Sequence, residues 1–351
     1  MKGLRKITPY IPGEQPNYSD MIKLNTNENP YPPSPKVTEA LTNFNPESLK
    51  RYSSVDNSEL KKALSNKFGL SPEYFLIGNG SDEVLAFCFL AFFNSSDPLL
   101  FPEITYGFYK VWADLFHIPF KEIPLKKDFS IDLNDYRQNN GGIILANPNA
   151  PTGLFQPLEA IEKLLLENPD VIVIVDEAYI DFAGVSAITL LENYPNLIII
   201  RTLSKANSLA GLRVGYAIGN PQYIRIAESI KSSFNHYSVD LLAETLATAA
   251  IEDKAYYDMT TEKICQTREW FIEELHSLGF DSLPSKTNFV LTTHPECKIS
   301  DLYRYLEEQD IFVRYFPTVE RLQTYLRISI GTQKEMASVL TVVKAYFSQL
   351  G

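Results

Sequence analysis

The chain has 351 residues, of which 45% are hydrophobic, so it can bury a sizeable core, and a prior of roughly 150 residues per domain predicts about two domains. Its formal net charge is −11 and no long run of Lys or Arg occurs, which argues against nucleic acid or an acidic membrane as partner. We expect a cytoplasmic protein, because residues 1–10 carry no secretory signal, no stretch approaches a membrane span, and three scattered cysteines fit reduced thiols.

The first part of the chain begins with residues 1–35, which are rich in Pro and Asn and predict an extended arm rather than a packed element. Apolar residues then recur at helical spacing and predict a helix over 57–68. A short strand over 74–77 comes next. After a polar, glycine-containing stretch, the apolar run 84–93 predicts a further helix.

The middle of the chain alternates apolar, β-branched runs with helical stretches. The runs lie at Gly142–Ala146, Val171–Val175 and Leu197–Ile200, and their continuous apolar character is typical of a parallel sheet that is buried on both faces. We therefore expect an α/β large domain over residues 36–240, with a mostly parallel sheet flanked by helices. Ligands collect beyond the carboxyl ends of such strands, so the residues that follow each run are candidates for chemistry.

The pattern changes after about residue 235. A long helical region over 238–278 is followed by shorter predicted elements, namely strands near 288–292, 311–315 and 325–330 and a final helix over 334–349. We expect residues 241–351 to form a connecting helix and a small α+β domain. The N-terminal arm, residues 1–35, should pack with this small domain.

Lys205 lies just past the third apolar run. A loop lysine on its own is usually exposed to solvent. Partial burial would lower the pKa of its amine toward neutrality and let it attack a carbonyl carbon. Ser204 and Arg213 place a hydroxyl and a fixed cation on either side, which suits a phosphate group. This surrounding string favours a reactive lysine over an ordinary loop residue.

Asp176 follows the second apolar run. An acid at the end of a buried strand is costly unless it has a cationic partner. A protonated pyridine nitrogen would be such a partner, and the pairing would let the ring act as an electron sink. Tyr179, three residues further on, could hydrogen-bond a phenolic oxygen of the same ring. The alternative interpretation is an aspartate that caps the next helix.

Gly80, Ser81 and Asp82 stand between a predicted strand and a predicted helix. Backbone N–H groups at the start of a helix form an anion site that suits a cofactor phosphate. The same tripeptide is also common as a turn and cap, and it is not a P-loop, because no Gly-Lys-Ser/Thr follows. Tyr106 could stack on a flat ring, or it could be an ordinary core aromatic.

Taken together, these residues resemble the fold type I pyridoxal-phosphate enzymes of the aspartate-aminotransferase type, and within them the histidinol-phosphate aminotransferase family. The resemblance covers essentially the whole chain. Its motifs are Leu24–Pro30, Arg51–Tyr52, Gly80–Glu83, Asn147–Gly153, Asp176–Tyr179, Ser204–Tyr216, Val313–Arg314 and Leu326–Ile328.

The resemblance implies that pyridoxal 5'-phosphate is carried as a Schiff base on Lys205, which also moves the proton between the substrate carbon and the cofactor. Asp176 would pair with the ring nitrogen, and Tyr179 would hold the phenolic oxygen. The other implied cofactor-binding residues are Gly80, Ser81, Asp82, Tyr106, Asn149, Ser204 and Arg213. Tyr52 would reach the phosphate site of the neighbouring subunit, which makes the active unit a homodimer.

One position departs from the family pattern. The family usually has Asn directly before Pro-Thr-Gly, where its amide meets the phenolic oxygen of the ring. Here that residue is Ala150, and Asn149 precedes it. An alanine offers no such hydrogen bond, so either Asn149 takes over the contact or Tyr179 makes it alone.

Arg314 and Arg327 lie beside strand-like segments of the small domain. Two arginines that converge on a cleft bind anions bidentately, although each could equally form a surface ion pair. The resemblance assigns them to the phosphate of one substrate and the carboxylate of the other, and it adds Asn27 to the substrate-binding residues. The four histidines have no metal-like spacing, so no metal is expected.

The resemblance implies transamination of histidinol phosphate with 2-oxoglutarate in histidine biosynthesis, giving imidazole-acetol phosphate and glutamate. An aromatic amino-acid aminotransferase or a threonine-phosphate decarboxylase would keep the same cofactor and fold with another substrate. A non-catalytic, cofactor-sensing protein would need an added DNA-binding segment, for which the chain has no basic module. The expected partners are therefore a phosphorylated amino alcohol, a 2-oxo acid and a second subunit.

Overall fold

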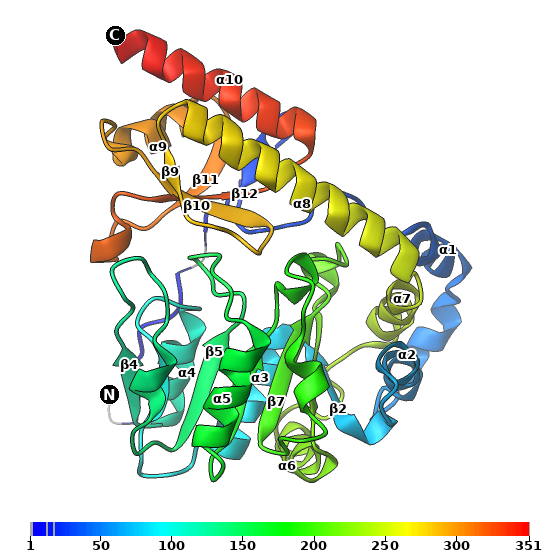
Figure 1. Ribbon diagram of the computed structural model, residues 1–351. Coiled ribbons are helices and arrows are strands. Elements are labelled where there is room, and N and C mark those ends of the chain that lie inside the picture. The colour runs from blue at the N-terminus through cyan, green and yellow to red at the C-terminus, as the bar shows by residue number, and fades with distance from the viewer. Residues whose placement is uncertain (1–2, 12, 17, 351) are drawn as a thin grey trace.

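Two sheets, one above the other in Figure 1, organise the computed structural model, which describes residues 3–11, 13–16 and 18–350. Among these residues the larger sheet has seven strands, in the order β2-β8-β7-β6-β5-β3-β4. In that order they are Phe75–Asn79, Val214–Gly219, Leu197–Thr202, Val173–Asp176, Gly142–Ala146, Leu99–Pro102 and Phe120–Ile123. β8 pairs antiparallel with both neighbours, whereas the other pairs are parallel. The expected mostly parallel sheet is confirmed, and the reversed β8 was not foreseen.

The central strands are apolar throughout because helices cover both faces of the large sheet. In β5, Ile143 and Leu145 pack in a core cluster with residues of α2 (Ser58–Phe68), α5 (Leu158–Glu167) and α7 (Leu241–Ile251). Ile144, between them, points the other way and packs with residues of α3 (Gly80–Phe92), α4 (Phe108–Phe116) and α6 (Pro221–Phe234). All three side chains are fully buried. The alternation of side chains across a strand thus turns one continuous apolar run into two cores.

The bounds of the helices are Pro35–Asn43 (α1), Ser58–Phe68 (α2), Gly80–Phe92 (α3), Phe108–Phe116 (α4), Leu158–Glu167 (α5), Pro221–Phe234 (α6), Leu241–Ile251 (α7), Lys254–Ser277 (α8), Ile299–Glu308 (α9) and Gln333–Leu350 (α10). The helices expected over 57–68 and 334–349 match α2 and α10 closely, whereas the one expected over 84–93 begins earlier, at Gly80. The long helical region expected over 238–278 is broken between α7 and α8 at Glu252 and Asp253. Gly69 caps the C-terminus of α2, and its φ of +70° is the left-handed conformation that glycine adopts without strain.

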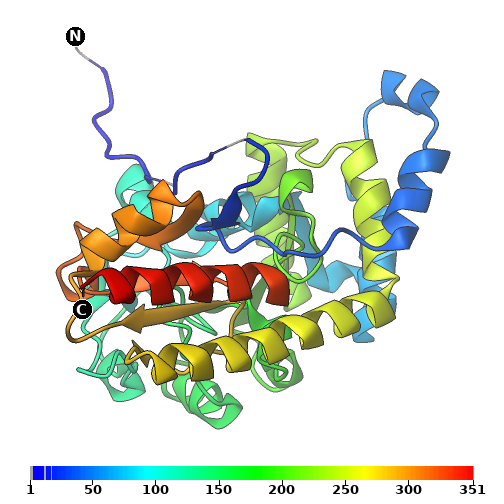
Figure 2. The same ribbon diagram turned by 90° about the horizontal axis from the view of Figure 1, so that it is seen from above.

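The smaller sheet has the order β1-β11-β12-β10-β9 among the described residues. Its strands are Ile22–Leu24, Ile311–Tyr315, Leu326–Ser329, Phe289–Thr293 and Asp281–Ser282 in that order. β1 belongs to the arm that was expected to be extended rather than a packed element, yet it runs parallel to β11 in this sheet. The arm is therefore hydrogen-bonded into this sheet. A separate core cluster joins the sheet to α8, α9 and α10, and Figures 1 and 2 show α10 alongside α8.

Short 3-10 helices complete the fold at Pro46–Lys50, Pro72–Tyr74, Leu133–Tyr136, Ile180–Phe182, Ala187–Leu190, Ala210–Leu212 and Glu320–Leu322 (η1–η7). α7 packs on the large sheet, since Leu246 and Ala250 belong to its core cluster. α8 then leads to the small sheet (Figure 1). The domain boundaries at 35/36 and 240/241 stay a prediction.

Candidate active site

The polar stretches that follow β5, β6 and β7 meet at one edge of the large sheet. In the sheet register Ala146 lies opposite Asp176, which in turn lies opposite Ile200. The chain leaves these strand ends toward Asn149 and Lys205. In Figure 1 the small sheet lies above the large one, and hydrogen bonds described below join the two at this edge.

Asp176 ends β6 and is only 5% exposed. Burial raises the pKa of its carboxyl to about 6, although hydrogen bonds from Tyr109 and Ala178 act in the opposite direction. The Tyr109 hydroxyl donates to Oδ2 at 2.7 Å, and the Ala178 N–H donates to Oδ1 at 3.1 Å. No cation forms an ion pair with this carboxylate among the residues that the structure describes. A cationic ring nitrogen would supply the missing partner.

Lys205 is half-buried in the turn after β7, and the N-terminal arm holds it from two sides. Its Nζ donates to the backbone oxygen of Thr26 at 3.2 Å. The side-chain amide of Asn29 donates to the backbone oxygens of Lys205 and Ala206, each at 3.1 Å. The arm therefore fixes both the backbone and the amine of this lysine.

Tyr179 stands next to Lys205, whose Nζ lies 5.7 Å from the centre of the tyrosine ring. The amide of Asn27 donates to the Tyr179 hydroxyl at 2.8 Å. Asn27 itself is 2% exposed, and its Oδ1 accepts a hydrogen bond from the Ser329 hydroxyl of β12 at 3.0 Å. This chain of contacts links Tyr179 to the small sheet.

At the start of α3, two glycines let Arg213 and β8 lie directly against the helix backbone, and we call this arrangement the cradle. Gly80 has φ +78°, and a Cβ there would lie 2.5 Å from Nη2 of Arg213. A Cβ on Gly215 of β8 would lie 2.2 Å from the backbone nitrogen of Ser81. Both positions need glycine, so that β8, Arg213 and the first turn of α3 can approach one another. The free N–H groups of this turn suit a phosphate.

Charged and hydroxyl groups surround this cradle. Asp82 pairs with Nη2 of Arg213 at 2.8 Å and accepts a hydrogen bond from the Tyr106 hydroxyl at 2.7 Å. Burial, together with the Asp82 charge, holds the pKa of Tyr106 well above its ordinary value. Ser204 is also buried, and its hydroxyl accepts a hydrogen bond from that of Thr202 at 2.9 Å. Thr202 pairs with Gly215 of β8, which brings Ser204 to the same region.

The amide of Asn149 is fully occupied by the protein. Its Nδ2 donates to the backbone oxygen of Ile104 and to the Thr152 hydroxyl, each at 3.0 Å. Its Oδ1 accepts from the Thr105 hydroxyl at 2.8 Å. Since both amide hydrogens are used, this geometry favours Tyr179 over Asn149 as the group that meets a phenolic oxygen.

Arg314 and Arg327 occupy directly opposed positions on β11 and β12. Nη2 of Arg314 donates to the backbone oxygen of Ile11 at 3.1 Å, and Nη2 of Arg327 donates to that of Asn25 at 2.8 Å. Burial lowers the pKa of Arg327, and the like charge of Arg314 adds to this effect. Nε of Arg327 is buried and makes no hydrogen bond within the described residues.

Tyr52 lies apart from these groups in the same chain. It is 81% exposed and stacks on Tyr237, with ring centres 4.5 Å apart. An aromatic ring held so far into solvent suits contact with another molecule. Leu49 and Phe234, 55% and 71% exposed, are further large apolar side chains without cover.

The arrangement fits a flat, phosphorylated cofactor that carries a carbonyl group. Lys205 offers the amine, and Asp176 offers an acid with no cationic partner in the described part of the chain. The first turn of α3, at Gly80, offers a cradle for the phosphate. The fold and this site define a pyridoxal-phosphate enzyme of fold type I.

Comparison with known proteins agrees with this class. Residues 19–343 match the family model of class I and II aminotransferases. The chain is 48% identical over 343 residues to a histidinol-phosphate aminotransferase of Lactococcus lactis subsp. cremoris, covering 98% of this chain and 96% of that protein. It belongs to the histidinol-phosphate aminotransferase family.

Two solved structures extend the comparison. The histidinol-phosphate aminotransferase of Clostridium acetobutylicum superposes with a TM-score of 0.86 at 25% identity, covering 94% of this chain and all of that one (100%). That of Sinorhizobium meliloti, solved with pyridoxal-5'-phosphate, gives 0.83 at 27% identity, covering 93% and 91%. The expected family, fold class and aminotransferase activity are confirmed, and so is the cofactor of this enzyme class. The roles of individual site residues stay predictions.

Several contacts in this site escaped the sequence reasoning. Tyr109 supports Asp176 from α4, a helix that the apolar pattern alone explains as core. Asn29 lies inside the motif Leu24–Pro30, yet nothing in its spacing shows which backbone groups it binds. Tyr10 of the arm stacks on Phe108, with ring centres 4.4 Å apart. Such long-range contacts leave no local signal in the sequence.

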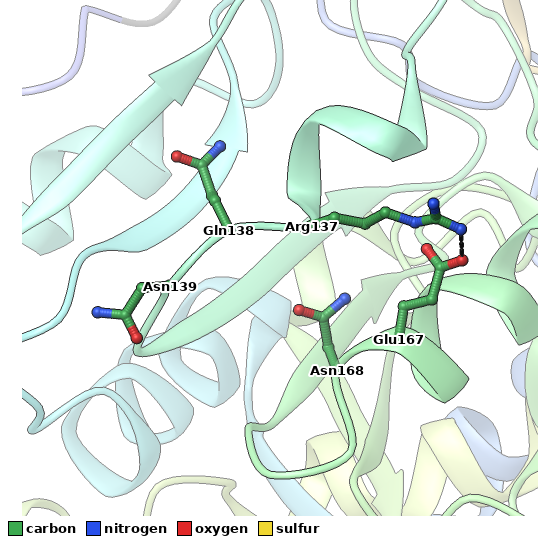
Figure 3. Close-up of a pocket in the computed structure, with 5 residues that line it drawn as sticks. All are labelled: Arg137, Gln138, Asn139, Glu167 and Asn168. Carbon is green, nitrogen blue, oxygen red and sulfur yellow. Dashed lines mark hydrogen bonds and ion pairs between the residues drawn. The ribbon is translucent and has the colours of Figure 1, made fainter.

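A separate hollow lies away from this site. About 450 Å³ in volume, it is lined by Arg137, Gln138, Asn139, Glu167 and Asn168. These residues precede β5 and β6, so the hollow opens at the opposite end of those strands from the site. Figure 3 shows Arg137 reaching Glu167, which leaves the hollow without an unpaired charge. We assign it no part in the chemistry.

Metal and membrane partners were both expected to be absent. In the part of the chain that the structure describes, no group of three or more His, Cys, Asp or Glu side chains is placed to hold a metal ion. Within the same residues, no helix is both long and apolar enough to cross a membrane.

Proposed function

We propose that this protein transfers an amino group between histidinol phosphate and 2-oxoglutarate, giving imidazole-acetol phosphate and glutamate. Its relatives of 44% to 48% identity, which it matches over nearly their whole length, are histidinol-phosphate aminotransferases. Both substrates are anions, and they react in turn at one site. The site therefore needs a positive clamp that accepts a phosphate or a carboxylate.

The observation that carries this proposal is the arginine pair of the small sheet. Arg314 and Arg327 face each other across β11 and β12, and each donates to a backbone oxygen while neither pairs with a carboxylate among the described residues. Like charges in such a position repel each other unless an anion lies between or beside them. The buried, unbonded Nε of Arg327 provides a further donor for that anion.

The other residues take roles that follow from their contacts. When bound, pyridoxal phosphate supplies an electron-withdrawing ring that stabilises negative charge on the substrate carbon. Asp176 holds the ring nitrogen in its protonated form, and Tyr109 fixes the direction of that carboxylate. Lys205 holds the cofactor and then moves the proton at the substrate carbon. Tyr179, oriented by Asn27, hydrogen-bonds the ring's phenolic oxygen.

The phosphate of the cofactor belongs in the cradle at the start of α3. Gly80, Ser81, Ser204 and Arg213 would hold it, and Tyr106 would cover one face of the ring. Asp82 orients Arg213 and Tyr106 through its two oxygens. Asn149 supports the loop of Tyr106 through Ile104 and Thr105.

We further propose a homodimer in the cytoplasm. Tyr52 is too exposed to act in its own chain's cradle, so it is assigned to the phosphate site of a second copy. The free thiols of Cys88, Cys265 and Cys297 suit a reducing compartment.

The test is a half-reaction with the purified holoenzyme. Histidinol phosphate should convert the cofactor from its aldehyde to its amine form, which is visible as a change of absorbance, and 2-oxoglutarate should reverse the change. L-Phenylalanine and threonine phosphate serve as competing donors. Faster conversion by phenylalanine, or release of carbon dioxide from threonine phosphate, would contradict the proposal and favour one of the two alternative activities.

A further inference from the structure

Arg321 lies on η7, in the connection between β11 and β12, and reaches from the small sheet to the large one. Its Nη1 donates to Oε1 of Glu103 at 2.5 Å and to the backbone oxygen of Leu125 at 3.1 Å. Its Nη2 donates to the backbone oxygen of Lys126 at 2.5 Å. The guanidinium carbon lies 4.6 Å from the ring centre of Phe129. Four groups of the large domain thus bind one side chain.

Glu103 connects this contact to the loop that carries Tyr106, the residue proposed to cover the cofactor ring. It follows β3 directly, and its Oε1 also accepts a hydrogen bond from the Leu125 N–H at 3.1 Å. Ile104 and Thr105, the next two residues, are bonded to the Asn149 amide. Tyr106 comes next in the chain. Glu103 is therefore three residues from Tyr106, in a segment that the Asn149 amide also holds.

The small-sheet end of the contact carries the arginine pair. β11 contains Arg314 and β12 contains Arg327, and η7 lies in the loop that joins these strands. Tyr325, just before β12, packs edge-on against Phe129, with ring centres 5.4 Å apart. The loop that joins the two strands is therefore fixed to the large domain by an aromatic contact as well as by Arg321.

We propose that Arg321 and Glu103 form a clasp that sets the gap between Tyr106 and the pair Arg314–Arg327. Arg321 is thus a positioning residue for anionic substrates and touches neither substrate nor cofactor. This inference rests on the proposed function only in assigning Arg314 and Arg327 to anions. Each clasp side chain is 32% exposed, and such ion pairs contribute little to stability. Its loss should therefore change substrate geometry more than folding.

The experiment measures glutarate binding to the holoenzyme. Glutarate is a five-carbon dicarboxylate without a group that can be transaminated, so its affinity reports the anion site alone. We expect Arg321→Ala to weaken glutarate binding by about tenfold, as for a lost charged hydrogen-bond set. Arg321→Lys should recover part of the loss, because the lysine ammonium keeps the positive charge but cannot make all the hydrogen bonds of the guanidinium. Glu103→Gln should show a smaller loss, since it keeps an acceptor for Leu125.

Arg304→Ala is the matched control, because Arg304 is an arginine of the small domain whose side chain is 68% exposed. It should leave glutarate affinity unchanged. Melting temperature and cofactor content are measured on every variant. In steady state, Arg321→Ala should raise KM for the 2-oxo acid by a larger factor than it lowers kcat.

Three outcomes would overturn the clasp. These are wild-type glutarate affinity in Arg321→Ala, a loss that parallels falling melting temperature or cofactor content, and no glutarate binding to the wild-type holoenzyme. Failure of histidinol phosphate as a donor would contradict the proposed function alone. In that case the relative glutarate affinities of the wild type, Arg321→Ala, Arg321→Lys and Glu103→Gln would still test whether the clasp positions the anion site.

Discussion

The hydroxyl of Tyr109 donates a hydrogen bond to Oδ2 of Asp176 across 2.7 Å, and this contact joins α4 to the end of β6. Both side chains are buried, Tyr109 completely. The bond favours the charged carboxylate, and it therefore opposes the increase in pKa that burial causes. An acid meant to hold a protonated ring nitrogen must itself be ionised at working pH, and Tyr109 contributes to that ionisation.

Tyr109→Phe should therefore weaken cofactor binding in a pH-dependent way. Without the hydroxyl the pKa of Asp176 rises above its present value of about 6, so less carboxylate exists near neutral pH. We expect a loss of roughly tenfold in pyridoxal-phosphate affinity near pH 6.5 that shrinks toward pH 8.5. Fluorescence titration of the cofactor-free protein across pH measures it. A loss that is equal at every pH would point to packing alone.

Asp176→Asn should stabilise the cofactor-free protein at alkaline pH. The pKa of Asp176 is raised in the fold from 3.8 to about 6, so the folded state loses stability as pH rises through that range. Asparagine carries no charge and avoids a loss of up to about 3 kcal/mol. We expect a higher melting temperature than wild type near pH 8 and no gain near pH 4.

The same variant should hold pyridoxal phosphate more weakly, because the ring nitrogen loses its anion. An electrostatic role of Asp176 predicts that this variant raises the melting temperature of the apo protein and lowers its affinity for the cofactor. A helix cap does not predict this combination. If Asp176→Asn lowered the melting temperature of the apo protein at every pH, the capping interpretation would gain support.

Gly80→Ala tests the phosphate cradle. The added Cβ would lie 2.5 Å from Arg213, and φ of +78° is strained for any side chain. We expect a loss of at least about tenfold in cofactor affinity, from a strain of roughly 1–2 kcal/mol and the displaced guanidinium. Gly211→Ala is the control, because a Cβ there meets nothing within 4 Å. Equal effects of the two variants on binding would argue against the cradle.

Asn29→Ala should slow transamination without emptying the site. The change removes both hydrogen bonds that hold the backbone oxygens of Lys205 and Ala206. Looser placement of the lysine should lower kcat by about tenfold or more, since proton transfer depends on alignment. Asn94→Ala, which removes a single bond to the Leu90 oxygen on the surface, should have no effect. Single-turnover absorbance measures both. Normal rates in Asn29→Ala would rule out the role.

Features that depend on residues close together in the chain could be predicted from the sequence. The apolar run that contains Val173 and Val175 indicates a parallel strand buried on both faces, because such a strand has apolar side chains on both sides. Asp176 and Lys205 stand out because parallel strands bring their ends to one edge. The reversal of β8 leaves no such mark, since an antiparallel strand inside a covered sheet is equally apolar.

Contacts between distant segments could not be predicted in the same way. Tyr109 with Asp176, and Arg321 with Glu103, each join residues far apart in the chain. Asn149 could be proposed for the ring oxygen because its neighbour is alanine. Only the structure shows its two amide hydrogens already bound to Ile104 and Thr152.

The arm's strand β1 has a consequence for movement of the small sheet. Residues 22–24 are hydrogen-bonded to β11 of the small sheet, while Thr26, Asn27 and Asn29 bind Lys205 and Tyr179. A rotation of the small sheet away from the large one would pull this segment with it. Such a movement would also loosen the hydrogen bond that holds the Lys205 amine, so the position of the small sheet and that of the amine would be coupled.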